Sequence, residues 1–251
     1  MMKQKRNLLI GKTAKTVTLS SGLLLLYACG GGNIPPSHTQ TQTMTIIHNG
    51  FTYITLTSPY TGKIWLDRNL GAAQNCDQSQ FDNACYGDYY QWGRNTDGHE
   101  DILSTTDKTP LPSIDTVSNL YIAHTDWLPD SNTNGIDLYG QARSLLWNKT
   151  NGSNVCPKDF RVPSIQELEA ETSDSTISFE TSFLKIPSIG YRDFSTGEKI
   201  ANNPQTQQGH LWSSSPVNND YGSYYRYEHQ GYISTLYDFR GNARPIRCIK
   251  N

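Results

Sequence analysis

The chain has 251 residues, enough for one sizeable domain or two small ones, and 18% of them are charged. Its formal net charge is -2, and because five basic and no acidic side chains precede Cys29, the remainder carries -7. This acidity argues against nucleic acid as a partner, since phosphate binding relies on Lys and Arg, and the 15 Tyr and 20 Gly residues favour a loop-rich α+β domain over a helical bundle.

The first 28 residues have the pattern of a secretory signal peptide. Residues 1–15 are basic, and the apolar run at 17–26 is shorter than the roughly 20 residues that a transmembrane helix needs. The end of this segment, Leu26-Tyr27-Ala28-Cys29, resembles the lipobox of bacterial lipoproteins, in which the cysteine after the cleavage site receives lipid, including palmitate. The sequence therefore predicts lipid attachment at Cys29. An ordinary signal peptide with a cysteine nearby by chance is the alternative.

The residues after Cys29 predict a tether and a location. Residues 29–43 contain GGGNIPPSHTQTQT, a composition typical of flexible linkers, and the folded domain is expected at 44–251. Gly30, and not Asp, follows the cysteine, which in a bacterium with two membranes favours the outer membrane. We therefore expect the domain in the cell envelope, with the membrane as a partner through the lipid anchor.

Four cysteines remain once Cys29 is set aside: Cys76, Cys85, Cys156 and Cys248. An even number in an oxidising compartment predicts two disulfides, although four cysteines allow three connectivities. Pairing Cys76 with Cys85 would close a short loop, and pairing Cys156 with Cys248 would close a long one. A metal site is the alternative, but the chain has no C-x-x-C motif.

In chain order, the first predicted element is a hairpin, because Asn49-Gly50 separates two runs of β-branched and aromatic residues. A strand follows around Ile64 and Leu66, and residues 87–94 are predicted as a short helix. Residues 102–154 are irregular and polar, with helical spacing only at 138–147, and long loops of this kind often carry binding sites.

The second half begins with a well-marked helix start. Ser164 follows Pro163, and Glu167 comes three residues later, which is the capping-box pattern, with Ile165 and Leu168 facing a core. Short strand-like segments then follow at 183–193, 209–217, 222–229, 231–239 and 243–250. Early strands, helical segments and a final run of strands predict an α+β fold.

Six segments, taken together and in this order, resemble the Fibrobacter succinogenes major paralogous domain (FISUMP): TGKIWLDRNLGA, YGDYYQWGR, CPKDFRVPSIQELEAE, LKIPSIGYRD, LWSSSP and ARPIRCIK. The resemblance covers residues 52–251 and implies a C-type-lectin-like fold, with paired N- and C-terminal strands, two helices, and a second small sheet with long loops. It also implies a disulfide between Cys156 and Cys248. It implies little chemistry, because fold does not fix function.

The segment DSNTNG matches the first half of a calcium-binding loop, whose predicted ligands are Asp130, Asn132, Asn134 and the Ile136 carbonyl. The acidic residue expected at the twelfth position is replaced by Gln141, and only Asp137 would add charge to that of Asp130, so a weak site is expected. An Asx-rich turn produces the same pattern and is the favoured interpretation. The sugar-binding motifs of calcium-dependent lectins are missing.

Aromatic residues provide the other candidate ligand surface. Trp65, Trp92 and Trp212 lie inside the family motifs and are expected in the core. The predicted ligand-binding residues are four tyrosines: Tyr224, Tyr225, Tyr227 and Tyr232. Plain β-propensity in exposed strands explains the same tyrosines without any ligand.

Two short His and acid clusters suggest catalysis or metal binding: residues 99–101 and 124–126. Both lie in polar loops, where solvated charge is the expected state, and no catalytic motif accompanies them. No catalytic residue and no cofactor other than weakly bound calcium are predicted.

The sequence thus favours a non-enzymatic envelope lipoprotein that recognises a carbohydrate or a protein. One alternative is an oxidase related to formylglycine-generating enzymes, which use a reactive cysteine pair near the C-terminus, where this chain has Cys248 alone. A structural envelope protein without a discrete ligand is the other.

Overall fold

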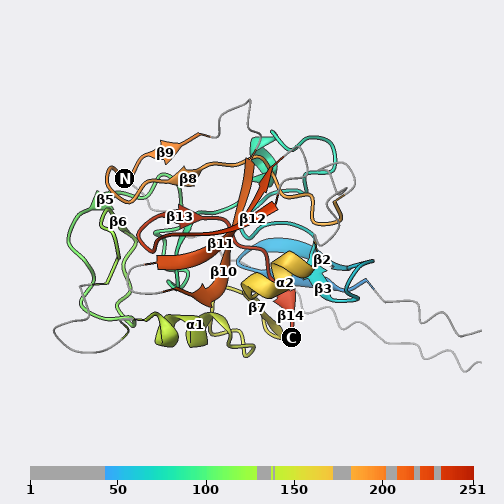
Figure 1. Ribbon diagram of the computed structural model, residues 1–251, viewed down its shortest axis with the longest axis horizontal. Helices are drawn as coiled ribbons and strands as arrows, with labels where there is room; N and C mark the ends of the chain where they lie inside the picture. Colours follow the sequence, from blue (N-terminus) through green and yellow to red (C-terminus); the bar gives the residue numbers. More distant parts are fainter. Residues whose placement is uncertain are drawn as a thin grey trace, which may run out of the picture. The chain divides into compact units, whose positions relative to one another are not determined.

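The computed structural model describes residues 43–128, 137, 139–171, 182–201, 208–217, 221–228 and 233–251, with the backbone alone at 223, 225–228 and 233 (Figure 1). These residues belong to one unit, Thr41–Asn251, and form several small sheets and two short α-helices. Nearly all strand pairs in them are antiparallel. This architecture of mostly antiparallel sheets with two short helices agrees with the α+β prediction and is rich in β structure.

The first sheet joins the two ends of the domain. Its strands, in spatial order, are β1 (Thr45–His48), β2 (Phe51–Thr57), β3 (Ile64–Leu66), β14 (Ile249–Lys250) and β7 (Phe160–Arg161). The predicted hairpin is confirmed, since Asn49 and Gly50 have φ of 47° and 82°, as a type I′ turn requires. Trp65 of β3 pairs with Ile249 of β14, so the last strand lies beside an early one.

Three further sheets complete the described architecture. One has β10 (Gln208–Pro216), β11 (Tyr221–Glu228) and β12 (Ile233–Phe239) in sequence order. Another has the order β4 (Tyr90–Gln91), β13 (Ala243–Arg244), β8 (Tyr191–Arg192) and β9 (Lys199–Ile200). The third is the parallel pair β5 (Thr106–Asp107) and β6 (Tyr121–Ile122).

The helix predicted over residues 87–94 is wrong. Gly87 and Gly93 have φ of 79° and 75°, outside the helical region, and the residues between them include β4, which pairs with β13. A Cβ on Gly93 would lie 2.4 Å from the Cβ of Arg143. Tertiary packing against this segment therefore favours an extended conformation over the helix that the local sequence suggested.

Both other predicted helices are present. The spacing at 138–147 becomes α1 (Gln141–Trp147), and the capping box begins α2 (Ile165–Ala170). The Glu167 N–H donates to Ser164 Oγ at 3.2 Å, and the Ser164 N–H donates to Glu167 Oε2 at 2.9 Å. α1 contacts β10, and α2 contacts β10, β11 and β12, as Figure 1 shows.

The five tryptophans lie in the core and each indole N–H has an acceptor. Trp65, Trp92, Trp127, Trp147 and Trp212 are 0% exposed. Four donate to backbone carbonyls at 2.8 to 3.1 Å, and Trp65 donates to Glu171 Oε1 at 3.0 Å. Because a buried N–H without an acceptor is costly, these bonds fix each ring in one orientation. The prediction that Trp65, Trp92 and Trp212 are core residues is confirmed.

Part of the long irregular region at 102–154, which was expected to form surface loops, is buried. In its described part, Tyr121, Ile122 and Trp127 are buried and pack into two hydrophobic clusters. The sequence did not predict these contacts, because the apolar residues of this region are few and occur singly or in pairs between polar residues.

The cysteines form two disulfides, Cys76–Cys85 and Cys156–Cys248. Cys156 precedes β7 and Cys248 precedes β14, so the second bond ties two neighbouring strands of the first sheet. The first closes a loop around the 3₁₀ helix η1 (Asn83–Cys85). Within the described part of the chain, no helix is long and apolar enough to cross a membrane.

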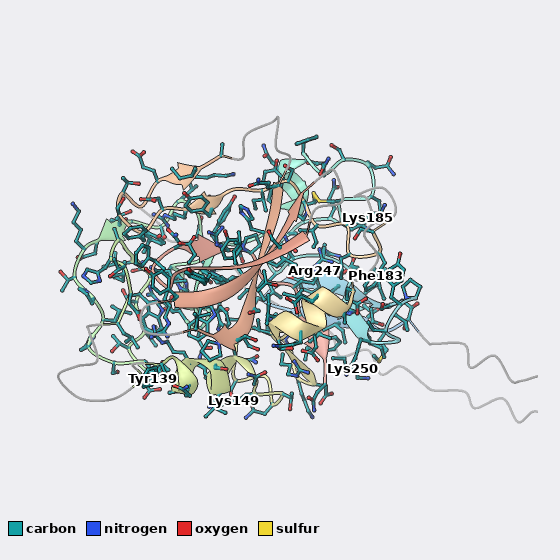
Figure 2. The ribbon with its side chains drawn as sticks, in the orientation of Figure 1. Tyr139, Lys149, Phe183, Lys185, Arg247 and Lys250 are labelled. Carbon is teal, nitrogen blue, oxygen red and sulfur yellow. A yellow bond between two sulfur atoms is a disulfide. The ribbon has the colours of Figure 1, made fainter. Side chains whose placement is uncertain are left out.

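Several arginines are nearly fully buried: Arg94, Arg143, Arg240, Arg244 and Arg247 (Figure 2 labels the last). Arg247 donates to Asn69 Oδ1 at 3.0 and 3.1 Å and to the Leu184 carbonyl at 2.9 Å. Burial lowers the pKa of Arg247 to about 10, so it remains charged at neutral pH. The core is thus held by guanidinium hydrogen bonds as well as by apolar contacts.

Candidate functional site

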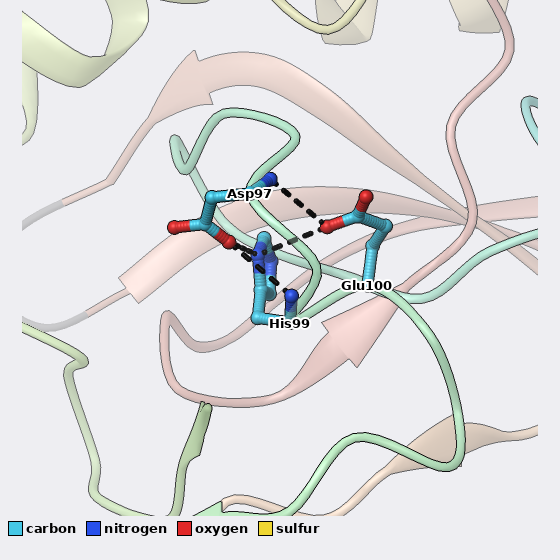
Figure 3. A group of neighbouring side chains, drawn as sticks. All are labelled: Asp97, His99 and Glu100. Carbon is cyan, nitrogen blue, oxygen red and sulfur yellow. Dashed lines mark hydrogen bonds and ion pairs between the residues drawn. The ribbon is translucent and has the colours of Figure 1, made fainter. Parts of the chain in front are cut away.

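Asp97, His99 and Glu100 form a cluster in the loop after β4, in which Asp97 is half-buried and the other two are buried (Figure 3). His99 Nδ1 lies 2.6 Å from Asp97 Oδ1 and 3.4 Å from Glu100 Oε2. Imidazole and carboxylate groups this close are the usual ligands of a transition metal, so the cluster is a candidate metal site.

Hydrogen bonds within the protein already use these ligand atoms. The Gln91 N–H donates to His99 Nε2 at 3.1 Å, so the proton is on Nδ1, which donates to Asp97. Glu100 Oε2 accepts from the N–H groups of Asp97 and Gly98 at 3.2 and 2.9 Å. Burial lowers the pKa of His99 and outweighs the opposing effect of the hydrogen bond that its Nδ1–H donates to Asp97. A metal ion would have to displace these bonds, and the cluster is better explained as the support of its own loop.

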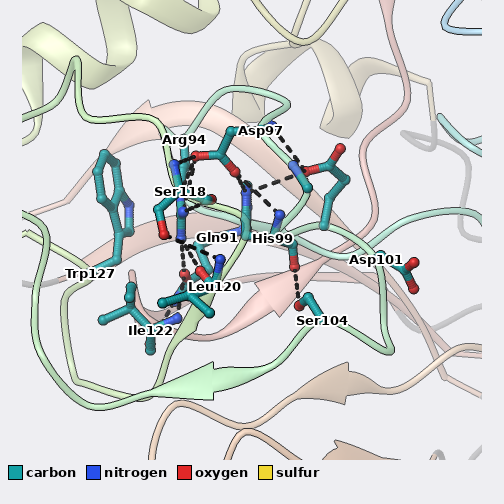
Figure 4. A network of polar contacts seen from close by, with 12 residues as sticks. Gln91, Arg94, Asp97, His99, Asp101, Ser104, Ser118, Leu120, Ile122 and Trp127 are labelled. Atoms are coloured by element: carbon teal, nitrogen blue, oxygen red, sulfur yellow. Dashed lines mark hydrogen bonds and ion pairs between the residues drawn. The ribbon is translucent and has the colours of Figure 1, made fainter.

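Arg94 extends this support to a distant segment (Figure 4). Its Nη2 lies 2.9 Å from Asp97 Oδ2, and its guanidinium donates to the Ser118 and Leu120 carbonyls at 2.5 and 3.0 Å. The guanidinium carbon lies 5.6 Å from the centre of the Trp127 ring. The network joins the loop after β4 to the residues before β6.

The expectation that the His and acid clusters at 99–101 and 124–126 are solvated is therefore wrong for some residues in each cluster. His99 and Glu100 are buried, whereas Asp101 is exposed. His124 is exposed as expected, but Asp126 is buried and accepts from Arg143 at 2.5 and 2.8 Å. The sequence pattern of a histidine followed by acidic residues does not predict which of these side chains is buried.

Arg143 and Arg240 share Asp126 beside the ring of Trp92. Arg240 Nη1 lies 3.4 Å from Asp126 Oδ2, and the two guanidinium carbons lie 5.6 and 5.1 Å from the Trp92 ring centre. Burial and the positive charge of Arg143 lower the pKa of Arg240 to about 10. These charges link Arg143 of α1 to Arg240, the residue after β12, through Asp126.

The described residues do not include the four predicted calcium-loop positions, Asp130, Asn132, Asn134 and Ile136, or Cys29. Asp137 is described: its Oδ1 accepts from the Ala142 N–H at 2.7 Å and its Oδ2 from Arg143 Nε at 2.6 Å. A carboxylate neutralised in this way adds little to cation binding. The expectation that Asp137 would add charge to the loop is therefore not supported.

Tyr224, one of the predicted ligand-binding tyrosines, lies in the core. It is 8% exposed, its ring meets that of Trp212 edge-on at 5.9 Å, and the Arg244 guanidinium carbon lies 3.9 Å from its centre. The surface expectation is wrong for Tyr224, because its side of β11 packs against the core. Nothing is described for the side chains of the other three, Tyr225, Tyr227 and Tyr232.

An acidic pocket of about 550 Å³ opens beside the loop after β4, and three carboxylates line it: Asp88, Glu100 and Asp101. Burial and the two neighbouring carboxylates raise the pKa of Asp88 to about 7. A Cβ on Gly71 would lie 2.1 Å from Asp88 Oδ2, so glycine is required for this approach. Ser104, which also lines the pocket, donates to the His99 carbonyl at 3.0 Å and accepts from Arg192 Nη1 at 2.6 Å, so its hydroxyl is held in place and not activated.

A second pocket, here called the Phe81–Lys199 pocket, encloses about 230 Å³ and has aromatic walls. Three separate segments line it: Phe81, Asn83 and Tyr86 from the disulfide-bonded loop, Ser188 and Gly190 before β8, and Lys199 and Ala201 in or after β9. The Phe81 residue that lines this pocket is 46% exposed. Sequence reasoning missed this site because no two of the segments are adjacent in the chain.

Lys199 is the charged group of the Phe81–Lys199 pocket. Its Nζ lies 5.1 Å from the centre of the Tyr86 ring and 5.4 Å from that of Tyr89. Burial lowers the pKa of Lys199, and no carboxylate among the described residues forms an ion pair with it. The side chain as a whole is exposed, so the pocket presents a solvent-accessible cation that no described carboxylate pairs with.

No protein-family model, curated protein or solved structure matches this chain.

Proposed function

We propose that this protein is a cell-envelope lipoprotein whose domain, residues 44–251, recognises a carbohydrate or a protein and catalyses no reaction. Cys29 carries the lipid anchor, residues 30–43 act as the tether, and the outer membrane is the location. The membrane and one surface ligand are the partners in this proposal, and nucleic acid is not, because the chain after the leader carries a net charge of -7.

Two features support membership of the FISUMP group and its C-type-lectin-like fold. The early strand β3 pairs with the last strand β14, and two short helices accompany a separate sheet of β10, β11 and β12. The Cys156–Cys248 disulfide has the position that the resemblance implies. These are features of architecture, and they support the family proposal without supplying a ligand.

The observation that carries the function is the state of Cys248, which is bonded to Cys156 and 0% exposed. A formylglycine-type oxidase needs a reactive thiol there, and a buried disulfide provides none. The polar clusters around His99 and Asp126 are likewise satisfied by internal partners. Recognition through a pocket therefore accounts for the described residues better than catalysis does.

A glycan and surface-protein array, run with and without calcium, tests the proposal on the mature lipidated protein in detergent. We expect saturable binding to at least one glycan or protein, and no free thiols when the unreduced protein is titrated under denaturing conditions. A titratable thiol at Cys248 would favour the oxidase alternative. A lack of binding across the array would favour a structural envelope protein.

A further inference from the structure

The cation in the Phe81–Lys199 pocket is accessible to an anionic ligand, because Lys199 is exposed and forms no ion pair with a described carboxylate. Its Nζ lies 5.1 Å from the ring centre of Tyr86 and 5.4 Å from that of Tyr89, so two aromatic rings flank the ammonium group. A carboxylate bound at Lys199 would accept a charge-assisted hydrogen bond from the ammonium group.

The size and walls of the pocket favour a sugar ring. Its volume of about 230 Å³ is below the usual range for drug-sized ligands and suits one small ring. The Phe81 and Tyr86 rings offer apolar faces for the C–H groups of a sugar, and the Asn83 amide and Ser188 hydroxyl line the same space. An acidic peptide side chain would use the ammonium group but would leave the ring faces and the amide without partners.

We propose that the Phe81–Lys199 pocket binds one hexuronate residue of an acidic glycan, with its carboxylate on Lys199 and its ring against Phe81 and Tyr86. This inference rests on the proposed recognition function and names its site and ligand class.

The walls of this pocket are held in place without a ligand. The Cys76–Cys85 bond closes the loop that carries Phe81, and the Tyr86 hydroxyl donates to the Phe81 carbonyl at 3.2 Å. The Ser188 N–H donates to the Gln80 carbonyl at 2.8 Å, which joins two of the three lining segments. A Cβ on Gly190 would lie 1.7 Å from the Ile200 carbonyl oxygen, so glycine lets β9 approach. Such preorganisation reduces the entropy cost of binding.

Calorimetry on the full lipidated chain in detergent tests this proposal with galacturonate, glucuronate and mannuronate oligosaccharides. The same oligosaccharides after reduction of each carboxyl to a primary alcohol are the neutral controls. We expect at least one acidic oligosaccharide to bind about tenfold or more tightly than its neutral form, as the loss of one charged hydrogen bond implies. Added salt should weaken the acidic interaction and leave the neutral one unchanged.

Three variants assign the binding to the pocket. Lys199→Gln should remove the preference for the acidic form, and Phe81→Ala should weaken both forms, each without a change in melting temperature. Lys149→Gln is the matched control, because Lys149 is an exposed lysine beyond α1, at the opposite edge of the view from β9 (Figures 1 and 2). It should bind as the parent does.

Equal affinities of the parent and Lys199→Gln for the acidic oligosaccharide would overturn the inference, as would a failure of every hexuronate to bind. If the array still finds a neutral glycan or a protein ligand, the recognition function stands and only this site assignment fails. If it finds no ligand, both fail.

Discussion

At the scale of single residues, Asp88 shows how a position in the fold changes the chemistry of a side chain. It lines the acidic pocket with Glu100 and Asp101, and burial together with these two carboxylates raises its pKa from 3.8 to about 7. The hydrogen bond from Tyr90 opposes this shift and is the weaker effect. The folded protein therefore holds a proton on Asp88 under conditions in which the unfolded chain has lost it.

Asp88→Asn should change the pH dependence of stability. Because the folded pKa is raised, the contribution of Asp88 is fully present below about pH 4 and is lost as the pH rises to about 7. We expect the parent to lose about 1–2 kcal/mol relative to Asp88→Asn between these limits, less than the full shift implies because the group is partly solvated. Urea unfolding at a series of pH values measures this difference. Parallel curves for the two proteins would contradict it.

His99 shows the same dependence on environment, in the opposite direction. Its position in a polar loop predicts solvation, yet its side chain is 0% exposed and both ring nitrogens are hydrogen-bonded. The partner of Nε2 is the backbone of Gln91, eight residues earlier, whose place is set by the pairing of β4 with β13. No local sequence pattern contains that information.

At the scale of elements, α2 is the helix that the sequence predicts best, because its signals are local. Ser164 and Glu167 exchange hydrogen bonds at the N-terminus, and Arg161 donates to both Glu167 oxygens at 2.7 and 2.6 Å. Burial alone would raise the pKa of Glu167, but these bonds lower it below its usual value. Ile165 and Leu168 then face the core on one side of the helix.

Ser164→Ala should remove the side-chain cap and cost about 1 kcal/mol of unfolding free energy. Gln166→Ala, an exposed position in the same helix, is the matched control and should have almost no effect. Chemical denaturation of the three proteins at neutral pH provides the comparison. If both variants behave alike, the cap does not stabilise α2.

At the scale of the whole molecule, the two disulfides constrain the chain to different extents. Cys156 and Cys248 are 92 residues apart, and their bond links the middle of the chain to its last strand. Cys76 and Cys85 are 9 residues apart and close one loop beside the Phe81–Lys199 pocket. Loop-closure entropy grows with the length of the closed loop, so the long bond restricts the unfolded state more.

Replacing each pair with alanine should show this difference. In the chain-entropy model, removing Cys156–Cys248 costs about 4–5 kcal/mol, and removing Cys76–Cys85 costs about 3 kcal/mol. Thermal and urea unfolding of the two double variants under identical conditions measures both. A larger loss from the short loop would show that native packing around η1, and not chain entropy, dominates.

The sequence by itself determined the elements whose signals lie within a few residues: the turn at Asn49-Gly50, the capping box of α2, the helical spacing of α1 and the strands β10, β11 and β12. The segment predicted at 183–193 is a strand only at Tyr191–Arg192. The preference for a positive φ and the hydrogen bonds of a reciprocal cap arise within a few residues, so a short stretch of chain specifies both.

Tertiary structure decided the features that depend on distant partners. Residues 87–94 contain the short strand β4 in place of a helix, because β13 and Arg143 pack against them. The acceptors of the buried arginines include groups far away in the chain. The Phe81–Lys199 pocket forms only where three separated segments meet. The pKa and the hydrogen-bond partners of a buried side chain depend on the groups around it in space, and the spacing of residues along the chain does not specify those groups.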